Sequence, residues 1–233
     1  MFHREYPIKL RDGIPPERIA LLRKVLERAP DHIPGFLESV LVEAPEGSSH
    51  DLVWRNVFRD VGAFWLYAGH PYHANLINDH LAPDAPNSMK AAGSTGSIWT
   101  DDGPVDPAEM SDLFQADAAL EAGGISAPEV HLHEHIDVVP GRSGDYLRAV
   151  EEIYLPAASR HGMRLLMTWR SPDGTGEHQL VFVWSVAGWG AAFRSFAGIS
   201  NEVDMMEQWL ATVRPLRTGG RRRYLLPTEL AVH

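Results

Sequence analysis

Three side chains that can take part in proton transfer lie in the segment 67–73 (YAGHPYH), namely Tyr67, His70 and His73. A neutral imidazole can remove a proton near pH 7, and a phenol can stabilise an oxygen on which charge develops. On one continuous helix Tyr67 and His73 would point about 120° apart. Pro71 disfavours helical geometry at His70, so the two side chains can converge. The segment therefore predicts an acid/base pair; histidines that only bind backbone carbonyls are the structural alternative.

A second group of histidines lies in the segment 131–137 (HLHEHID). On a strand His131, His133 and His135 share one face, about 6.6 Å apart, and the apolar residues occupy the other. The apolar face should meet the helices, so the histidines are expected to line a ligand cavity, with His133 as a second acid/base and the other two binding substrate. Strand histidines also suit zinc or iron, so a divalent metal held by these three is the alternative to a metal-free site. Solvated histidines are the structural alternative.

Other candidates are less specific. His70 is expected to bind substrate, and Trp54 could wall a pocket for an aromatic ligand, although tryptophans in strands usually belong to the core. Arg170 could bind a carboxylate or phenolate, and its strand is expected to place it on one face with Arg164. The basic run 221–223 is expected to be the solvent-exposed start of a strand.

The elements that must position these residues repeat in the two halves of the chain. Hydrophobic periodicity and turn signals predict, in the first half, strands at 6–11, 36–43, 51–58 and 98–99 and helices at 15–28 and from Asp60 onward. In the second half they predict strands at 131–139, 163–170, 180–186 and 222–226 and helices at 145–160, 189–196 and 202–213.

This order, β-α-β-β-α-β twice, predicts an α+β fold of two tandem ferredoxin-like modules. Each sheet has helices on one face only, so we expect the two sheets to pack as an α+β barrel with an internal ligand cavity. The predicted domains are 1–100 and 129–233. The connector 101–128 carries a helix predicted at 107–122 and follows the Gly/Ser-rich run 91–97.

Composition excludes several classes of protein. The 233 residues carry a net charge of −10, which argues against binding nucleic acid through phosphate neutralisation. No apolar stretch is long enough to span a membrane, the N-terminus is too polar for a signal peptide, and there is no cysteine. We therefore expect a cytoplasmic protein without disulfides or Cys-ligated metals. No P-loop, GxGxxG, GxSxG or HExxH motif is present, so nucleotide, flavin and serine-hydrolase chemistry are unsupported.

The segment 51–73 resembles the stress-responsive dimeric α/β-barrel (Dabb) family, whose signature is a strand, Phe-x-Asp/Glu and Tyr-x-x-His-Pro-x-His. The matching residues here are Phe58, Asp60, Tyr67, His70, Pro71 and His73. The resemblance implies that Tyr67 and His73 form the acid/base pair that a plant polyketide cyclase of this family uses for an aldol-type ring closure. The first-strand histidine of that cyclase corresponds to Arg4 here. His3 is one residue away and should point to the other face of the sheet.

The second half, from Glu129 to about Pro227, resembles a NIPSNAP-type module. The resemblance rests on Val139-Pro140-Gly141, Tyr154-Leu155-Pro156, His161-Gly162, Trp169-Arg170, the run 181–184 (VFVW) and Trp189. It implies the same barrel fold.

The resulting prediction is an enzyme without an organic cofactor, a cyclase, lyase or isomerase that transfers protons on a small aromatic or polyketide-like molecule. In it His73 is the base and Tyr67 its hydrogen-bonding partner. One alternative is a monooxygenase, cofactor-independent or metal-dependent. Another is a non-catalytic protein that binds a small molecule. A homodimer is a further expectation, because the barrel could close between two chains.

Overall fold

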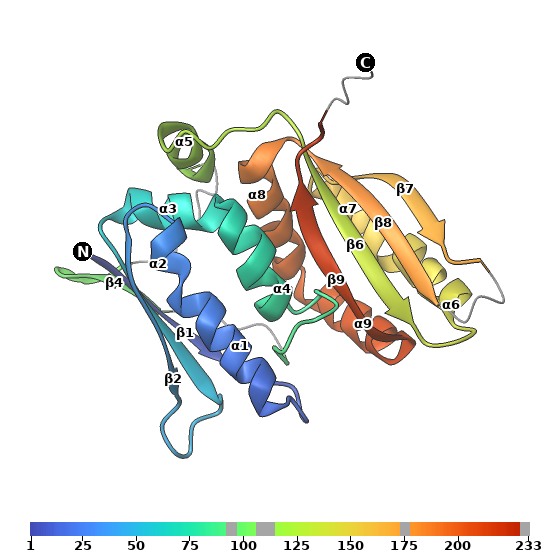
Figure 1. The fold of residues 1–233 in the computed structure, drawn as a ribbon, viewed down its shortest axis with the longest axis horizontal. Helices are drawn as coiled ribbons and strands as arrows, with labels where there is room; N and C mark the ends of the chain where they lie inside the picture. Colours follow the sequence, from blue (N-terminus) through green and yellow to red (C-terminus); the bar gives the residue numbers. More distant parts are fainter. Residues whose placement is uncertain (92–96, 106–114, 173–177, 229–233) are drawn as a thin grey trace. The chain divides into compact units, whose positions relative to one another are not determined.

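The computed structural model describes residues 1–91, 97–105, 115–172 and 178–228, and the chain divides into two compact units, 1–125 and 126–233 (Figure 1). Most of the run 91–97 and the predicted helical residues 107–114 lie outside the described residues. No described helix has both the length and the hydrophobicity needed to cross a bilayer.

Unit 1 contains one antiparallel sheet with the strand order β2-β3-β1-β4-β5. Its strands are β1 (Phe2–Ile8), β2 (Phe36–Glu43), β3 (Leu52–Phe58), β4 (Ser97–Thr100) and β5 (Gly103–Pro104). Its helices are α1 (Pro16–Glu27), α2 (Ala29–His32), α3 (Val61–Gly69), the π-helical turn η1 (His73–Ile77), α4 (Asn78–Leu81) and α5 (Gln115–Ala122).

Unit 2 contains a second antiparallel sheet with the order β7-β8-β6-β9. Its strands are β6 (Val130–Val138), β7 (Arg164–Arg170), β8 (Gln179–Val186) and β9 (Arg217–Leu225). Its helices are α6 (Ser143–Ala149), the π-helical turn η3 (Val150–Tyr154), α7 (Leu155–Arg160), α8 (Gly188–Asn201), α9 (Val203–Val213) and the 3₁₀ turn η4 (Arg214–Leu216).

The strand order is the same in both units. The first strand lies between the third and the fourth, β1 between β3 and β4, and β6 between β8 and β9, and β5 extends the unit 1 sheet beyond β4. This is the ferredoxin-like order, so the predicted α+β fold of two tandem modules is confirmed. The packing of the two sheets into a barrel stays a prediction.

Two strands differ from their predicted bounds. The first strand, predicted at 6–11, runs from Phe2 to Ile8. Only its two end residues are buried, and the polar residues between them hide the apolar alternation that predicts a strand. The last strand, predicted at 222–226, already begins at Arg217, because its glycines give no β signal.

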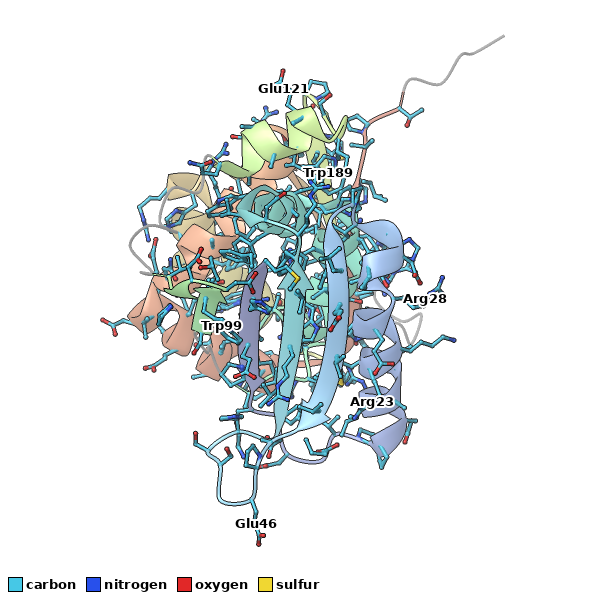
Figure 2. All side chains as sticks on the ribbon, turned by 90° about the vertical axis from the view of Figure 1, so that its left-hand side faces the viewer. Arg23, Arg28, Glu46, Trp99, Glu121 and Trp189 are labelled. Atoms are coloured by element: carbon cyan, nitrogen blue, oxygen red, sulfur yellow. The ribbon has the colours of Figure 1, made fainter. Side chains whose placement is uncertain are left out.

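One face of the unit 1 sheet carries the core, and its residues alternate along the strands. Phe2 and Ile8 of β1 and Trp54 and Phe58 of β3 are buried on this face, against the helices. Asp60, where the second helix was predicted to begin, caps α3 by accepting a hydrogen bond from the Ala63 amide. Figure 2 shows the side chains of this unit, with Trp99 on β4 and Glu46 at the tip of the β2–β3 connection.

Helix α5 packs closely against α3. A Cβ atom on Gly69 would lie 2.5 Å from Cδ1 of Leu120, and one on Gly123 would lie 2.9 Å from Cδ1 of Leu66. Both glycines therefore leave room for a leucine of the opposite helix, and Leu120 is itself buried. The second half of the predicted helix 107–122 is thus part of the unit 1 core.

Candidate active site

The proline in the 67–73 segment ends one helix and starts another. Helix α3 ends at Gly69, His70 is extended (φ −65°, ψ 139°), and a new helical segment begins at Pro71. The rings of Tyr67 and His73 therefore meet, with centroids 4.4 Å apart and planes inclined by 41°. The π-helical turn that begins at His73 is a departure from regular helix of the kind often found at functional sites.

His73 is held in one tautomer. Its Nδ1 lies 2.8 Å from the Ala68 carbonyl oxygen, which can only accept a hydrogen bond, so Nδ1 carries the proton and Nε2 the lone pair. Burial lowers the pKa of His73 to about 3, and the charge of Arg4 acts in the same direction. The imidazole is therefore neutral at pH 7, in the form a general base requires.

Tyr67 remains a phenol at neutral pH. Its side chain is 2% exposed, and burial raises its pKa to about 12 although Arg4 opposes that shift. Nη1 of Arg4 donates a hydrogen bond to the Tyr67 hydroxyl oxygen at 3.2 Å. A hydroxyl that accepts from a cation is a better donor, so Tyr67 is suited to stabilise an oxyanion.

Arg4 reaches this pair from β1 and lies among aromatic rings. Its guanidinium carbon is 4.4 Å from the ring centroid of Tyr6 and 5.5 Å from that of Trp54. Trp54 thus lines the site from β3 and is itself fixed by its hydrogen bond to Ser39 (2.9 Å). Among the described residues no carboxylate lies within ion-pair distance of Arg4.

Asn56 is a site residue that the sequence reasoning missed. It lies directly opposite Arg4 in the β1–β3 register and is 2% exposed. Its side chain points to the same face of the sheet as Trp54 and Phe58. The ring centroids of these two residues lie 6.0 and 5.3 Å from that of Tyr67. Neither its amide nitrogen nor its amide oxygen has a hydrogen-bond partner among the described residues. The available signal was an asparagine at an inward position of an otherwise apolar strand face.

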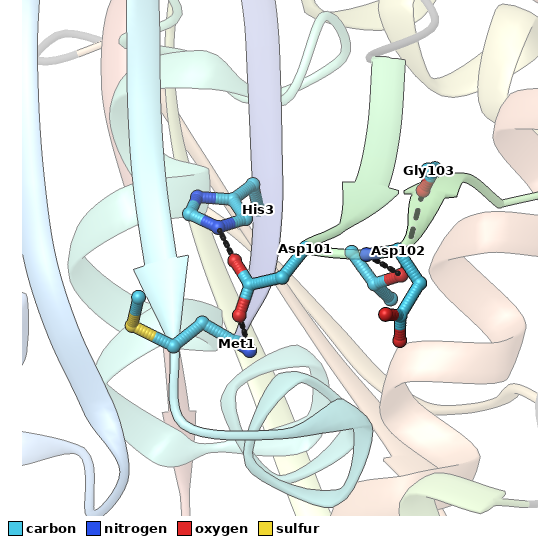
Figure 3. A network of polar contacts seen from close by, with 6 residues as sticks. Met1, His3, Asp101, Asp102 and Gly103 are labelled. Atoms are coloured by element: carbon cyan, nitrogen blue, oxygen red, sulfur yellow. Dashed lines mark hydrogen bonds and ion pairs between the residues drawn. The ribbon is translucent and has the colours of Figure 1, made fainter.

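His70 and His3 have other contacts. Nδ1 of His70 accepts a hydrogen bond from the Tyr72 amide at 3.1 Å, and burial lowers the pKa of His70 to about 4. His3 lies on the opposite sheet face from Arg4, as expected, and its ring stacks on Trp99. Its Nε2 lies 3.0 Å from Oδ1 of Asp101 (Figure 3). A substrate-binding role for His70 stays a prediction.

In unit 2, strand β6 alternates as predicted. His131, His133 and His135 are half-buried on one face, and the residues between them are buried on the other. Burial lowers the pKa of His133, and the ring centroids of His131 and His133 are 6.4 Å apart. Within the described residues no three His, Asp or Glu side chains are grouped so as to hold a metal ion. The catalytic, substrate-binding and metal-binding roles of these histidines stay predictions.

The buried face of β6 carries a charged residue, Glu134. Arg222 of β9 donates to it from Nε at 2.9 Å and from Nη2 at 2.6 Å, and Trp184 donates at 2.9 Å. Glu134 and Arg222 are both buried. The expectation of a solvent-exposed 221–223 run is therefore wrong for Arg222, because its cross-strand pairing with Glu134 places it on the helix face.

The predicted grouping on β7 is also wrong. A bulge between Leu165 and Met167 shifts the register, so Arg164 pairs with Ser185 whereas Arg170 pairs with Leu180. Arg164 and Arg170 therefore point to opposite faces, and Arg170 is exposed. Its substrate-binding role stays a prediction.

A surface pocket of about 940 Å³ lies within unit 2. Among its lining residues are Glu129, Arg164 and Ser185. Glu129 accepts a hydrogen bond from the Ser185 hydroxyl and lies 3.6 Å from Arg164. Glu129 therefore links Ser185 and Arg164 in the wall of this pocket.

Comparison with known proteins gives structural likenesses only. No family model matches the sequence, and no curated protein matches it. A NIPSNAP family protein of unknown function from Agrobacterium tumefaciens strain C58 is 15% identical; the match covers 45% of this chain and 92% of that chain, with a TM-score of 0.40. SnoaB, a cofactor-independent oxygenase from Streptomyces nogalater, is 12% identical over 46% of this chain and 100% of that chain, with a TM-score of 0.35.

A third similar structure is a dimeric protein of unknown function with a ferredoxin-like fold from Bacteroides fragilis. It is 21% identical over 31% of this chain and 75% of that chain, with a TM-score of 0.27. The strand orders of the two units, rather than these likenesses, establish the fold. The resemblance of the 51–73 segment to the Dabb family stays a prediction.

Proposed function

We propose that unit 1 carries an enzyme that transfers protons at a carbon next to a carbonyl group of a small aromatic or polyketide-like molecule. The corresponding reaction classes are cyclase, lyase and isomerase. The observation that carries the proposal is the contact between a buried neutral imidazole, His73, and a buried phenol, Tyr67, that Arg4 polarises.

The two side chains have complementary tasks. Nε2 of His73 takes a proton from the carbon, and the electron pair of the broken C–H bond moves onto the carbonyl oxygen as an enolate. The Tyr67 hydroxyl donates a hydrogen bond to that oxygen. The imidazolium can then return the proton to a different atom. Alternatively, the enolate carbon attacks a second carbonyl and closes a ring; the π electrons of that carbonyl move onto its oxygen, and the resulting alkoxide takes the proton from the imidazolium. Burial strengthens each of these electrostatic contacts.

Exchange of ketone α-protons for deuterium, followed by NMR in D₂O, tests the proposal without the natural substrate. The probes are a panel of aryl ketones and 1,3-diketones. The wild type should accelerate exchange on at least one probe, and His73→Gln should lower its kcat by about 10²- to 10⁴-fold, the usual contribution of a positioned base. Tyr67→Phe should lower it by about 10²-fold, as loss of an oxyanion donor does.

His3→Gln is the matched control, because His3 lies on the opposite face of the same sheet. It should exchange at the wild-type rate. A wild type that exchanges no probe faster than buffer, or a His73→Gln variant that keeps full activity, would contradict the proposal. Oxygen consumption with the same probes would indicate a monooxygenase instead, and tight binding without exchange would indicate a binding protein.

A further inference from the structure

We propose that Arg4 and Asn56 form an anion subsite beside Tyr67 and His73 and that the substrate of this centre carries a carboxylate. The inference rests on the proposed function, because it assigns a substrate class to the same centre. It depends on two independent observations made within the described residues, a cation without an acidic partner and a buried side-chain amide without a hydrogen-bond partner.

The first observation concerns Arg4. A guanidinium has five N–H donors, and Arg4 uses one of them on the Tyr67 hydroxyl. The surrounding rings of Tyr6, Trp54 and Tyr67 offer π faces but no negative charge. Arg4 is half-buried, so a ligand can reach it from solvent. Its remaining donors fit the two oxygens of a carboxylate.

The second observation concerns Asn56. A buried polar group without a partner destabilises the folded chain, and native proteins contain few of them. Both amide atoms of Asn56 are in this condition among the described residues. The neighbouring buried Ser39 has both of its partners, since it donates to the Leu26 carbonyl and accepts from Trp54. The unpartnered amide therefore points to a ligand, which would accept from its NH₂ group.

The two residues are cross-strand partners on the face that contacts Tyr67. A carboxylate bound between them would lie next to the phenol, with the rest of the molecule directed along the Tyr67–His73 pair. The positive charge of Arg4 lowers the pKa of His73 in the free protein. A bound carboxylate offsets that charge, so His73 becomes a stronger base when the substrate is present.

A matched pair of ligands tests the subsite by isothermal titration with the full chain. The probes are 4-oxo-4-phenylbutanoate and its methyl ester, which share a carbon skeleton and differ in charge. The wild type should bind the carboxylate at least about tenfold more tightly than the ester. Arg4→Met and Asn56→Leu should each weaken carboxylate binding about tenfold or more and leave ester binding unchanged.

Arg55→Met is the control variant, because Arg55 is an exposed cation next to Asn56 on β3. Its Nε pairs with Oε1 of Glu5 at 2.7 Å. It should keep the preference for the carboxylate. The proposal is overturned if the wild type binds both probes equally or neither, or if Asn56→Leu keeps the preference. That last result would leave Asn56 with a purely structural role.

The titration, together with the deuterium-exchange assay on the same two probes, separates this inference from the proposed function. Tight carboxylate binding that depends on Arg4 and Asn56, without any proton exchange, would reject the enzyme and retain the subsite. Proton exchange that is equally fast for ester and carboxylate, and unaffected by Arg4→Met, would retain the enzyme and reject the subsite.

Discussion

The first strand of each module carries a charged side chain on its inward face, Arg4 in β1 and Glu134 in β6, and the two cores accommodate that charge differently. In unit 2 Glu134 accepts hydrogen bonds from Arg222 and Trp184, and the charge is balanced within the protein. Among the described residues of unit 1, the Arg4 guanidinium hydrogen-bonds only to a hydroxyl, and the side-chain amide of the neighbouring Asn56 has no hydrogen-bond partner. The same fold thus contains one polar cluster that the protein completes and one that it leaves for a ligand to complete.

The largest expected effect tests the completed cluster. Arg222→Met leaves Glu134 buried without its counter-charge, so we expect it to lower the free energy of unfolding by about 3–5 kcal/mol. Urea denaturation measures this change. The double variant Glu134→Leu/Arg222→Leu should be less destabilised than Arg222→Met, because no charge is then left unpaired. Equal losses would show that the cluster acts only through packing.

A smaller effect of opposite sign tests the open cluster. Leucine has the same branching and the same number of side-chain heavy atoms as asparagine. Asn56→Leu removes an amide that has no partner among the described residues, so it should raise the free energy of unfolding by about 1–3 kcal/mol. Ser39→Ala, at the neighbouring position of β2, removes a hydroxyl with two partners and should lower that free energy by about 1 kcal/mol. The melting temperatures of the two variants check this. If both variants shift the melting temperature in the same direction, the amide of Asn56 and the hydroxyl of Ser39 do not differ in their effect on stability.

The smallest effect concerns pH. The pKa of His73 is about 3 in the folded chain and about 6.5 when exposed, so below pH 6.5 the unfolded chain binds a proton that the folded chain does not. Stability therefore falls as the pH decreases from 6.5 toward 3, by about 1 kcal/mol over the first pH unit. His73→Gln should show a flatter dependence in melting curves at pH 5.5 and 6.5. A parallel dependence would mean that His73 titrates normally in the fold.

Local patterns predicted most of the fold. Turn residues separated the strands, Asp60 marked the start of α3, and Pro71 marked the break that brings Tyr67 and His73 together. These signals act over a few residues, so they can be read from a single sequence. The predicted bounds were wrong at β1, where polar residues interrupt the apolar alternation.

The contacts that distinguish the two modules could not be read in this way. Strand register brings together residues that are far apart in the chain, namely Arg4 with Asn56 and Glu134 with Arg222. A side chain on an inward strand position looks the same in sequence whether its partner is present or not. The bulge in β7, which separates Arg164 from Arg170, has likewise no marker in the residues around it.

The close packing of α5 on α3 has a consequence for how two such modules can be joined in one gene. Leu120 occupies the space that the missing side chain of Gly69 leaves, next to the segment that carries Tyr67 and His73. A recombination point near residue 100 would separate α5 from the helix it covers and expose that apolar surface. A fusion or exchange of modules therefore preserves the first module only when the crossover falls after α5, near residue 125.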